Sequence, residues 1–256
     1  MSRSRLPVLM YHGLHEAADA RLDPVYSVTP AEFAKQLDWL RDHGFRTVRL
    51  GESAPADRPD KSAVISFDDG DATNCSVALP LLAARGMVAE FFITSDFIGR
   101  PGMVSEDDVR ALAAAGMGVQ AHGRSHRFLE DLGSEELEAE LLDSKRRLES
   151  ITGRSVTALA LPGGRGSERE RAAALRLGYR RVLTSIPGVN RGALAYDCRE
   201  RIAVTRGMGL DEFSDLLQWR GMRPRLMRTR YHVLAWPKRL LGNRRYERLR
   251  TRFLPG

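Results

Sequence analysis

Short apolar runs alternate with amphipathic helical segments along most of this 256-residue chain. The strand-like runs include LPVLMYH at 6–12, SAVISF at 62–67, VAEFFIT at 88–94 and TALALP at 157–162. Between such runs, segments such as 134–153 repeat apolar residues at helical spacing. This alternation predicts parallel strands with helices packed outside them. We therefore expect an α/β fold, and the pattern fits a closed barrel and a doubly wound open sheet equally well.

Positive charge is concentrated at the C-terminus. Residues 220–256 contain twelve Lys or Arg and one acid, Glu247, whereas the whole chain has a formal net charge of +7. We expect one main domain over residues 1–219 and a basic helical appendage over 220–256. The appendage is typical of contact with an anionic membrane, of binding an anionic part of a substrate, or of a helix that packs on the domain. No motif indicates binding to nucleic acid.

Cysteine content and hydrophobicity bear on location. Cys75 and Cys198 form no CxxC pair, which is typical of a reducing compartment. The first apolar run is interrupted by Pro7 and is too short for a signal sequence, and no stretch approaches the roughly 20 apolar residues that span a bilayer. We expect a cytoplasmic protein that is membrane-peripheral if its tail contacts lipid.

Polar residues follow several predicted strands at their carboxyl ends, where active sites of α/β folds lie. The residues are His12 after the first strand, Asp68 and Asp69 after SAVISF, His122 and His126 after MGVQA, and Pro162, Gly163 and Gly164 after TALAL. The two glycines would let the backbone approach a substrate or metal closely. An ordinary turn explains them equally well.

Asp68 and Asp69 are neighbours, and each raises the cost of ionising the other unless a cation lies near them. His122 and His126 are four residues apart, which suits one metal ion if the segment turns helically. An aspartate pair alone is more often a cap, and such a histidine pair alone is more often a coincidence. Together at one end of one sheet they favour a divalent metal site with one carboxylate and two imidazoles. The other aspartate would then be a general base.

The segments SFDDG (66–70) and HGRSH (122–126) resemble two motifs of the polysaccharide deacetylase family, also called NodB-homology or carbohydrate esterase family 4 proteins. The resemblance covers about residues 5–215, with a mild departure at Gly123. It implies a distorted (β/α)7-type barrel. It also implies that Asp69, His122 and His126 hold a divalent metal, usually Zn²⁺, with Co²⁺ or Ni²⁺ as alternatives, and that Asp68 is the general base.

The sequence departs from the family pattern at two groups: the arginine that orients the base and the histidine that acts as general acid. Ala160 stands where the third family motif has an arginine that orients the base, and Arg165 is a candidate substitute. No histidine follows His126 before His232, so the family's late general-acid histidine is missing. The opening MYH resembles a permuted, exopolysaccharide N-deacetylase-like branch, in which the acid strand lies at the N-terminus. That resemblance implies His12 as general acid, with a structural histidine as the alternative.

The resemblance implies a metal-dependent N-deacetylase that acts on an N-acetylated glycan or glycolipid in cell-surface glycan synthesis. Pro162, Gly163 and Gly164 would contact the substrate. Two alternatives stay open: a barrel that binds glycan without catalysis, and a deformylase of an amino-sugar lipid. The intact set of Asp69, His122 and His126 argues against a protein that only binds.

Overall fold

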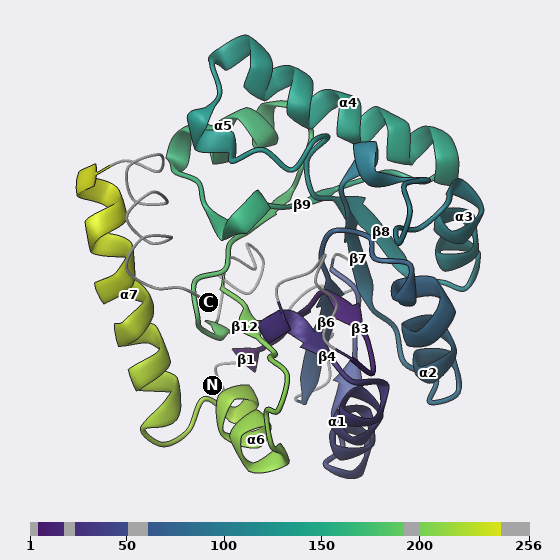
Figure 1. Ribbon diagram of the computed structural model, residues 1–256, viewed down its shortest axis with the longest axis vertical. Helices are drawn as coiled ribbons and strands as arrows, with labels where there is room; N and C mark the ends of the chain where they lie inside the picture. Colours follow the sequence, from purple (N-terminus) through teal and green to yellow (C-terminus); the bar gives the residue numbers. More distant parts are fainter. Residues whose placement is uncertain (1–4, 18–23, 51–60, 192–199, 242–256) are drawn as a thin grey trace.

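A curled parallel sheet forms a half-barrel wrapped by helices in the computed structural model, which describes residues 5–17, 24–50, 61–191 and 200–241 (Figure 1). The strand order is β10-β9-β8-β7-β6-β2-β12, and β5 pairs with the beginning of β6. Every pairing in this sheet is parallel. The predicted α/β, (β/α)7-type architecture is confirmed.

The strands of the main sheet are β2 (Val8–Tyr11), β5 (Arg46–Thr47), β6 (Ser62–Phe67), β7 (Glu90–Ile93), β8 (Gly118–Ala121), β9 (Ala158–Ala160), β10 (Arg181–Leu183) and β12 (Ile202–Ala203). The helices are α1 (Pro30–Asp42), α2 (Leu79–Ala83), α3 (Glu106–Ala114), α4 (Ser134–Thr152), α5 (Glu168–Arg176), α6 (Leu210–Gln218) and α7 (Arg223–Leu241). Two small pairs complete the sheets: β1 (Arg5–Leu6) with β11 (Asn190–Arg191), and β3 (Gly13–Leu14) with β4 (Ser27–Val28). Among the residues described, no helix is long and apolar enough to cross a membrane.

Local sequence signals set several of these boundaries. Thr29 caps α1 and forms a reciprocal capping box with Glu32. The strand SAVISF ends at Phe67, so Asp68 is the first residue beyond it. Of the run FRTVRL at 45–50, only Arg46 and Thr47 pair with β6.

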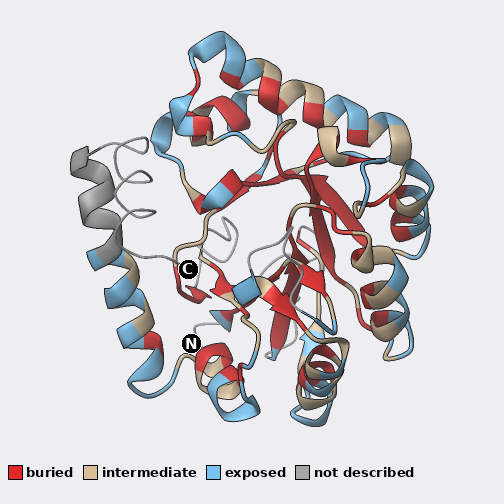
Figure 2. Ribbon diagram, in the orientation of Figure 1, coloured by how far each residue is buried: buried red, intermediate tan, exposed pale blue. Residues whose placement is uncertain are grey.

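Alternation along the strands separates two apolar cores. One lies between sheet and helices and contains Leu9, Ile65 and Phe91. The other fills the inside of the half-barrel and contains Leu6, Val8, Leu50, Val64, Phe92, Ala158, Ala160 and Leu183. Figure 2 shows the strands as buried along most of their length. Because strand side chains alternate, Asp68 continues the inward series of Val64, and His12 continues that of Val8.

The N-terminal strand β2 lies between β6 and the late strand β12. An isolated parallel bridge between Pro187 and Arg201 brings the segment after β10 beside the start of β12. The strand order therefore places the first strand of the sheet, β2, directly beside the strand that carries the two aspartates, and the last strand, β12, on the other side of β2.

A buried carboxyl group, Glu90, occupies the amino-terminal end of the half-barrel. It accepts hydrogen bonds from the backbone N–H of Leu50 and from the side chain of Gln120, and Gln120 in turn accepts from the N–H groups of Thr157 and Ala158. Burial raises the pKa of Glu90 from 4.5 to about 7. The fold therefore favours the protonated form of this side chain.

We expect this group to make stability fall as pH rises. The unfolded chain loses the Glu90 proton near pH 4.5 and the folded protein near pH 7. The stabilisation is therefore complete below pH 4.5 and is lost as pH passes through 7, a change of about 3 kcal/mol in the free energy of unfolding. Urea denaturation of wild type and Glu90→Gln across this range tests it, since the variant keeps a carbonyl acceptor for Leu50. The exposed Glu135→Gln is the control. Parallel pH profiles for wild type and Glu90→Gln would contradict the assignment.

Candidate metal centre and active site

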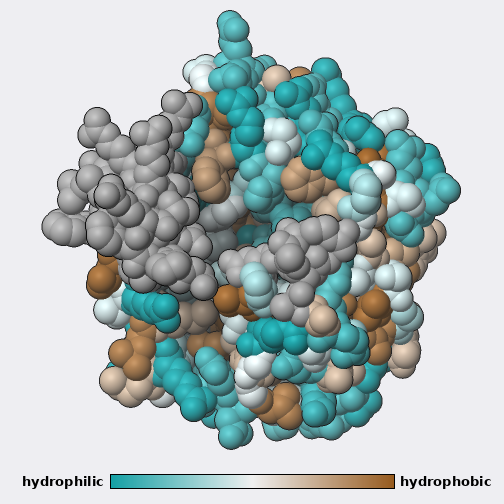
Figure 3. All heavy atoms as spheres, viewed as in Figure 1, coloured by the Kyte–Doolittle hydropathy of each residue, from teal (hydrophilic) through white to brown (hydrophobic). Residues whose placement is uncertain are grey.

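A cavity of about 220 Å³ lies at the carboxyl ends of the strands. It is lined by His12, Tyr26, Asp68, Asp69, His122 and His126, and by Gly163, Gly164 and Ser185. Figure 3 shows a hollow with hydrophilic residues near the centre of this view. Most of the site residues predicted from the sequence thus meet around one cavity, although they come from four strand ends.

Asp69, His122 and His126 form a cluster with the chemistry of a metal centre. One ligand atom from each residue lies within 4.8 Å of the other two. The Asp69 Oδ1 atom is 3.3 Å from His122 Nε2 and 3.2 Å from His126 Nε2. Donors about 2 Å from a tetrahedral ion are separated by about 3.3 Å, so these separations suit Zn²⁺.

The tautomer of His122 supports the same interpretation. Its Nδ1 atom is 2.9 Å from the carbonyl oxygen of Ala160. A carbonyl can only accept, so Nδ1 carries the hydrogen and, in the neutral ring, Nε2 presents a lone pair to Asp69. Asp69 Oδ1 is buried and has no hydrogen-bond partner among the described residues. Two electron-rich atoms in contact need a cation between them, and the residues therefore fit a divalent metal.

Backbone geometry brings Asp69 to the histidines. Asp69 has φ 75°, in the left-handed region that few non-glycine residues adopt. Its carbonyl accepts a hydrogen bond from Thr94 N–H, which holds the turn. The turn separates the two adjacent carboxylates. Burial raises the pKa of Asp69, but the adjacent imidazoles of His122 and His126 outweigh it and hold that pKa well below its usual range.

The segment that carries the histidines is a turn, so the expected helical turn after Ala121 is wrong. Gly123 has φ 76° and His126 has φ 65°. A side chain at position 123 would lie 3.3 Å from Glu140 and 3.4 Å from Pro162, which explains why glycine stands there. The left-handed residues fold the segment back, and the two imidazole rings lie 5.1 Å apart.

Glu140 of α4 holds this turn in place through hydrogen bonds. Its carboxylate is buried and accepts from both the backbone N–H and the hydroxyl of Ser125. Ser144, one turn further along α4, donates to the carbonyl of Gly123. The sequence contains a signal for both, because they interrupt the apolar face formed by Leu137, Leu141 and Leu148. Polar residues on the buried face of an amphipathic helix need partners.

Asp68 forms a buried ion pair with Arg201, which sequence reasoning missed. The guanidinium donates to both carboxylate oxygens, at 2.7 and 2.8 Å. Arg201 also donates to the carbonyl of Thr184, and its side chain is fully buried. Burial alone would raise the pKa of Asp68, but Arg201 and His122 hold it below its usual range.

Arg165 does not replace the arginine that is missing at Ala160. Its guanidinium lies over the ring of Phe128, 4.3 Å from the centroid. Arg201 supplies the positive charge from the start of β12 instead. An arginine directly before the apolar run IAV was the available signal, since a charge inside a sheet must be paired.

His12 follows β2 and lines the same cavity. Its ring stacks on Tyr26 with centroids 4.8 Å apart, and its carbonyl accepts from the side chain of Asn74. Burial lowers the pKa of His12, while the negative charges of Asp69 and Asp68 oppose that shift. The Nδ1 atom is buried without a hydrogen-bond partner among the described residues. The ring therefore has a free polar atom in the neighbourhood of the aspartates.

The glycines after β9 form part of the cavity wall. The 3-10 turn η5 (Pro162–Gly164) has φ 62° at Gly163 and φ 65° at Gly164. A side chain on Gly163 would meet the ring of Phe128 at 2.6 Å, and one on Gly164 would collide with Ser185. Pro162 is buried and packs near Gly123, and it does not line the cavity.

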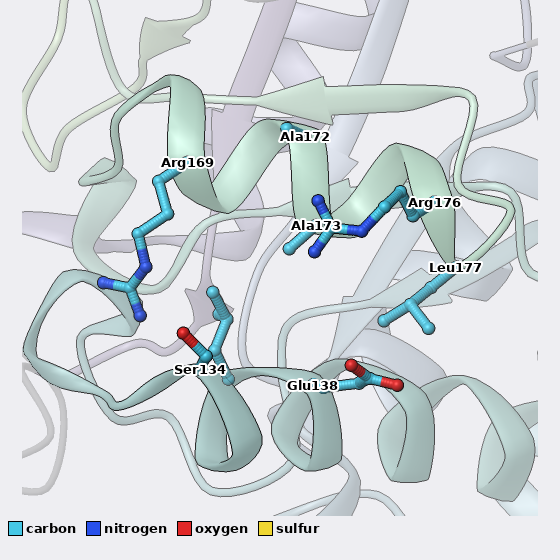
Figure 4. Close-up of a pocket in the computed structure, with 8 residues that line it drawn as sticks. Ser134, Glu138, Arg169, Ala172, Ala173, Arg176 and Leu177 are labelled. Carbon is cyan, nitrogen blue, oxygen red and sulfur yellow. The ribbon is translucent and has the colours of Figure 1, made fainter.

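A second hollow, of about 300 Å³, lies between α4 and α5. Figure 4 shows Arg169 and Arg176 of α5 across from Ser134 and Glu138 of α4. Arg169 is already bonded to the carbonyl of Leu132. This groove is larger than the site cavity but holds no cluster of metal-ligating or acid–base groups, so the chemistry lies at the strand ends.

The chain is similar in sequence to known proteins. Residues 56–182 match a family model described as polysaccharide deacetylase. The Bacillus subtilis (strain 168) protein YxkH, provisionally named a polysaccharide deacetylase, is 28% identical over 220 residues, or 84% of this chain and 77% of that protein. A poly-beta-1,6-N-acetyl-D-glucosamine N-deacetylase of Staphylococcus epidermidis is 35% identical over 78 residues, or 29% of this chain and 27% of that protein.

Several solved structures share the fold of this chain. A polysaccharide deacetylase from Bacillus cereus has a TM-score of 0.77 at 23% identity and covers 84% of this chain and 69% of its own. The structure of IcaB from Ammonifex degensii has a TM-score of 0.71 at 25% identity, and the match covers 84% of this chain and 97% of that protein. The expected family resemblance is confirmed.

We expect Glu140 to support metal affinity. Glu140→Ala removes the acceptor of Ser125, which frees the turn between His122 and His126, so the dissociation constant for Zn²⁺ should rise about 10- to 100-fold. Competition with a chromophoric chelator measures it. Glu138→Ala, exposed on the same helix, is the control and should bind as wild type. Unchanged affinity in Glu140→Ala would show that the turn does not depend on this carboxylate.

We expect the Asp68–Arg201 pair to be strongly coupled. Arg201→Met leaves a buried carboxylate without its partner and should lower the free energy of unfolding by about 3–5 kcal/mol. Adding Asp68→Asn should recover part of that loss. Urea denaturation completes the double-mutant cycle. Arg110→Met, which breaks exposed pairs with Glu106 and Asp107 on α3, should cost about 1 kcal/mol or less. Strictly additive losses at 68 and 201 would refute the coupling.

Proposed function

Because this chain carries a polysaccharide deacetylase domain over residues 56–182, we propose that it hydrolyses N-acetyl groups of an amino sugar with the help of a divalent metal. Asp69, His122 and His126 would hold the ion. One observation carries the proposal: these three donors line a single cavity together with an arginine-paired aspartate and the half-buried His12. Zn²⁺ suits this donor set, and Co²⁺ and Ni²⁺ share its ligand preferences.

A bound divalent ion would polarise the acetyl carbonyl and the attacking water. Asp68 takes the proton of that water as general base. Arg201 engages both oxygens of Asp68, yet each carboxylate oxygen has a second lone pair, so one remains available for the proton. The guanidinium also fixes the plane of the carboxylate, which orients the base before the substrate arrives.

His12 is the general acid, which donates a proton to the leaving amine. An amine leaves an amide only when it is protonated, so the reaction needs an acid near the nitrogen. His12 lines the cavity, and its Nδ1 atom has no partner within the described residues. Stacking on Tyr26 holds the ring. The base and the acid then come from adjacent strands, β6 and β2.

The proposed substrate class is an N-acetylglucosamine-containing surface polysaccharide or its precursor. Support comes from the name of the Staphylococcus epidermidis relative, a poly-beta-1,6-N-acetyl-D-glucosamine N-deacetylase. Gly163 and Gly164 lie in the cavity wall, where their backbone would contact the sugar ring beside the acetyl group. A cytoplasmic location stays a prediction.

Two variants should separate the base from the acid. Asp68→Asn should abolish acetate release from an N-acetylglucosamine oligomer, because no group accepts the water proton. His12→Ala should lower amide hydrolysis by about 10²–10⁴-fold. It should spare hydrolysis of 4-nitrophenyl acetate, whose phenolate leaves without a proton. Acetate release and nitrophenolate absorbance measure the two reactions.

Metal content and folding of both variants serve as controls, measured by elemental analysis and circular dichroism. Both variants should keep the metal, since neither is one of its ligands. Equal loss of ester and amide hydrolysis in His12→Ala would refute its role as acid. Tight binding of the oligomer by wild type without any acetate release would favour a glycan-binding protein.

A further inference from the structure

Helix α7 packs on the domain through one side. Its first turn begins at Met222, whose carbonyl accepts from the N–H of Leu226 at 2.9 Å. Pro224 is buried and Met227 packs against the main core. Arg228 forms a 2.8 Å ion pair with Glu200, next to β12. Figure 1 shows α7 on the outside of the molecule, beyond α6.

The opposite side of α7 exposes an apolar stripe. Met222, Leu226 and Val233 are 64%, 60% and 62% exposed. At 3.6 residues per turn they fall within an arc of about 40°, facing away from Pro224. They are half of the six large hydrophobic residues that are exposed in the described part of the chain. Figure 3 shows hydrophobic atoms along the left edge, where Figure 1 places α7.

Arginines flank this stripe on both sides. Arg223 and Arg230 lie on one flank and Arg225 on the other, and all three are exposed. No Asp or Glu occurs between residues 216 and 246. Arg223 also pairs with Asp215 of α6 at 3.7 Å. The surface therefore combines a narrow apolar strip with a largely positive border.

We propose that this face of α7 lies on the surface of a membrane that contains anionic phospholipid. The apolar stripe would enter the boundary between headgroups and acyl chains, while the flanking guanidinium groups bind lipid phosphates. Three side chains expose too little apolar area for a stable protein interface. The long arginine side chains cover the edges of such a stripe while their charged ends stay at the headgroups. The inference does not depend on the proposed deacetylase reaction.

Vesicle co-sedimentation of the full chain tests the proposal. Wild type should bind phosphatidylcholine vesicles that contain phosphatidylglycerol, and binding should weaken at high salt. It should bind pure phosphatidylcholine vesicles at least tenfold more weakly. The pair Leu226→Glu and Val233→Glu should lower binding to anionic vesicles about tenfold or more, and so should Arg225→Gln with Arg230→Gln.

The matched control changes two other exposed leucines, Leu175→Glu with Leu210→Glu, which lie on α5 and α6. It should bind vesicles as wild type. Binding by Leu226→Glu with Val233→Glu at the wild-type level would overturn the proposal. So would competition by millimolar inorganic phosphate, which would indicate a soluble phosphate ligand. A dimer in sedimentation velocity that only this stripe variant disrupts would show instead a protein interface.

Discussion

Two adjacent carboxylates can remain ionised in a buried cavity only if each has its own positive partner. The protein meets this requirement by pointing them apart. Asp68 continues the inward register of β6 and reaches Arg201. Asp69 adopts a left-handed backbone and turns toward His122 and His126, where a divalent cation held by these three residues would be its positive partner. The two aspartates therefore face different partners because of one change of backbone direction after Phe67.

The position of the guanidinium depends on the order of the strands. β2 lies between β6 and β12. The bridge between Pro187 and Arg201 places Arg201 at the mouth of the half-barrel. Ala160 leaves the inside of β9 apolar, and its carbonyl instead fixes the tautomer of His122. The charge that family members supply from the third motif thus comes here from another strand. The departure at position 160 is a relocation of the arginine.

The sequence was sufficient for groups whose chemistry is local. It predicted the end of SAVISF at Phe67, the parallel α/β fold and the set of metal-type donors, because these follow from periodicity and residue type. It did not predict Arg201, since its partner lies 133 residues earlier and their contact depends on strand order. It also gave the wrong conformation for the histidine segment. That turn is shaped by Gly123 and by Glu140 of a distant helix.

Alternation along a single strand links the inside of the half-barrel to its outer surface. Neighbouring side chains point to opposite faces. Arg201 points into the half-barrel and pairs with Asp68, while Glu200 points outward and pairs with Arg228 of α7. The backbone of Glu200 is held as well, because its N–H and carbonyl both bond to the side chain of Asn190. Contacts thus hold this segment on both faces, and the helix that carries the proposed membrane surface touches the segment that places Arg201 beside Asp68.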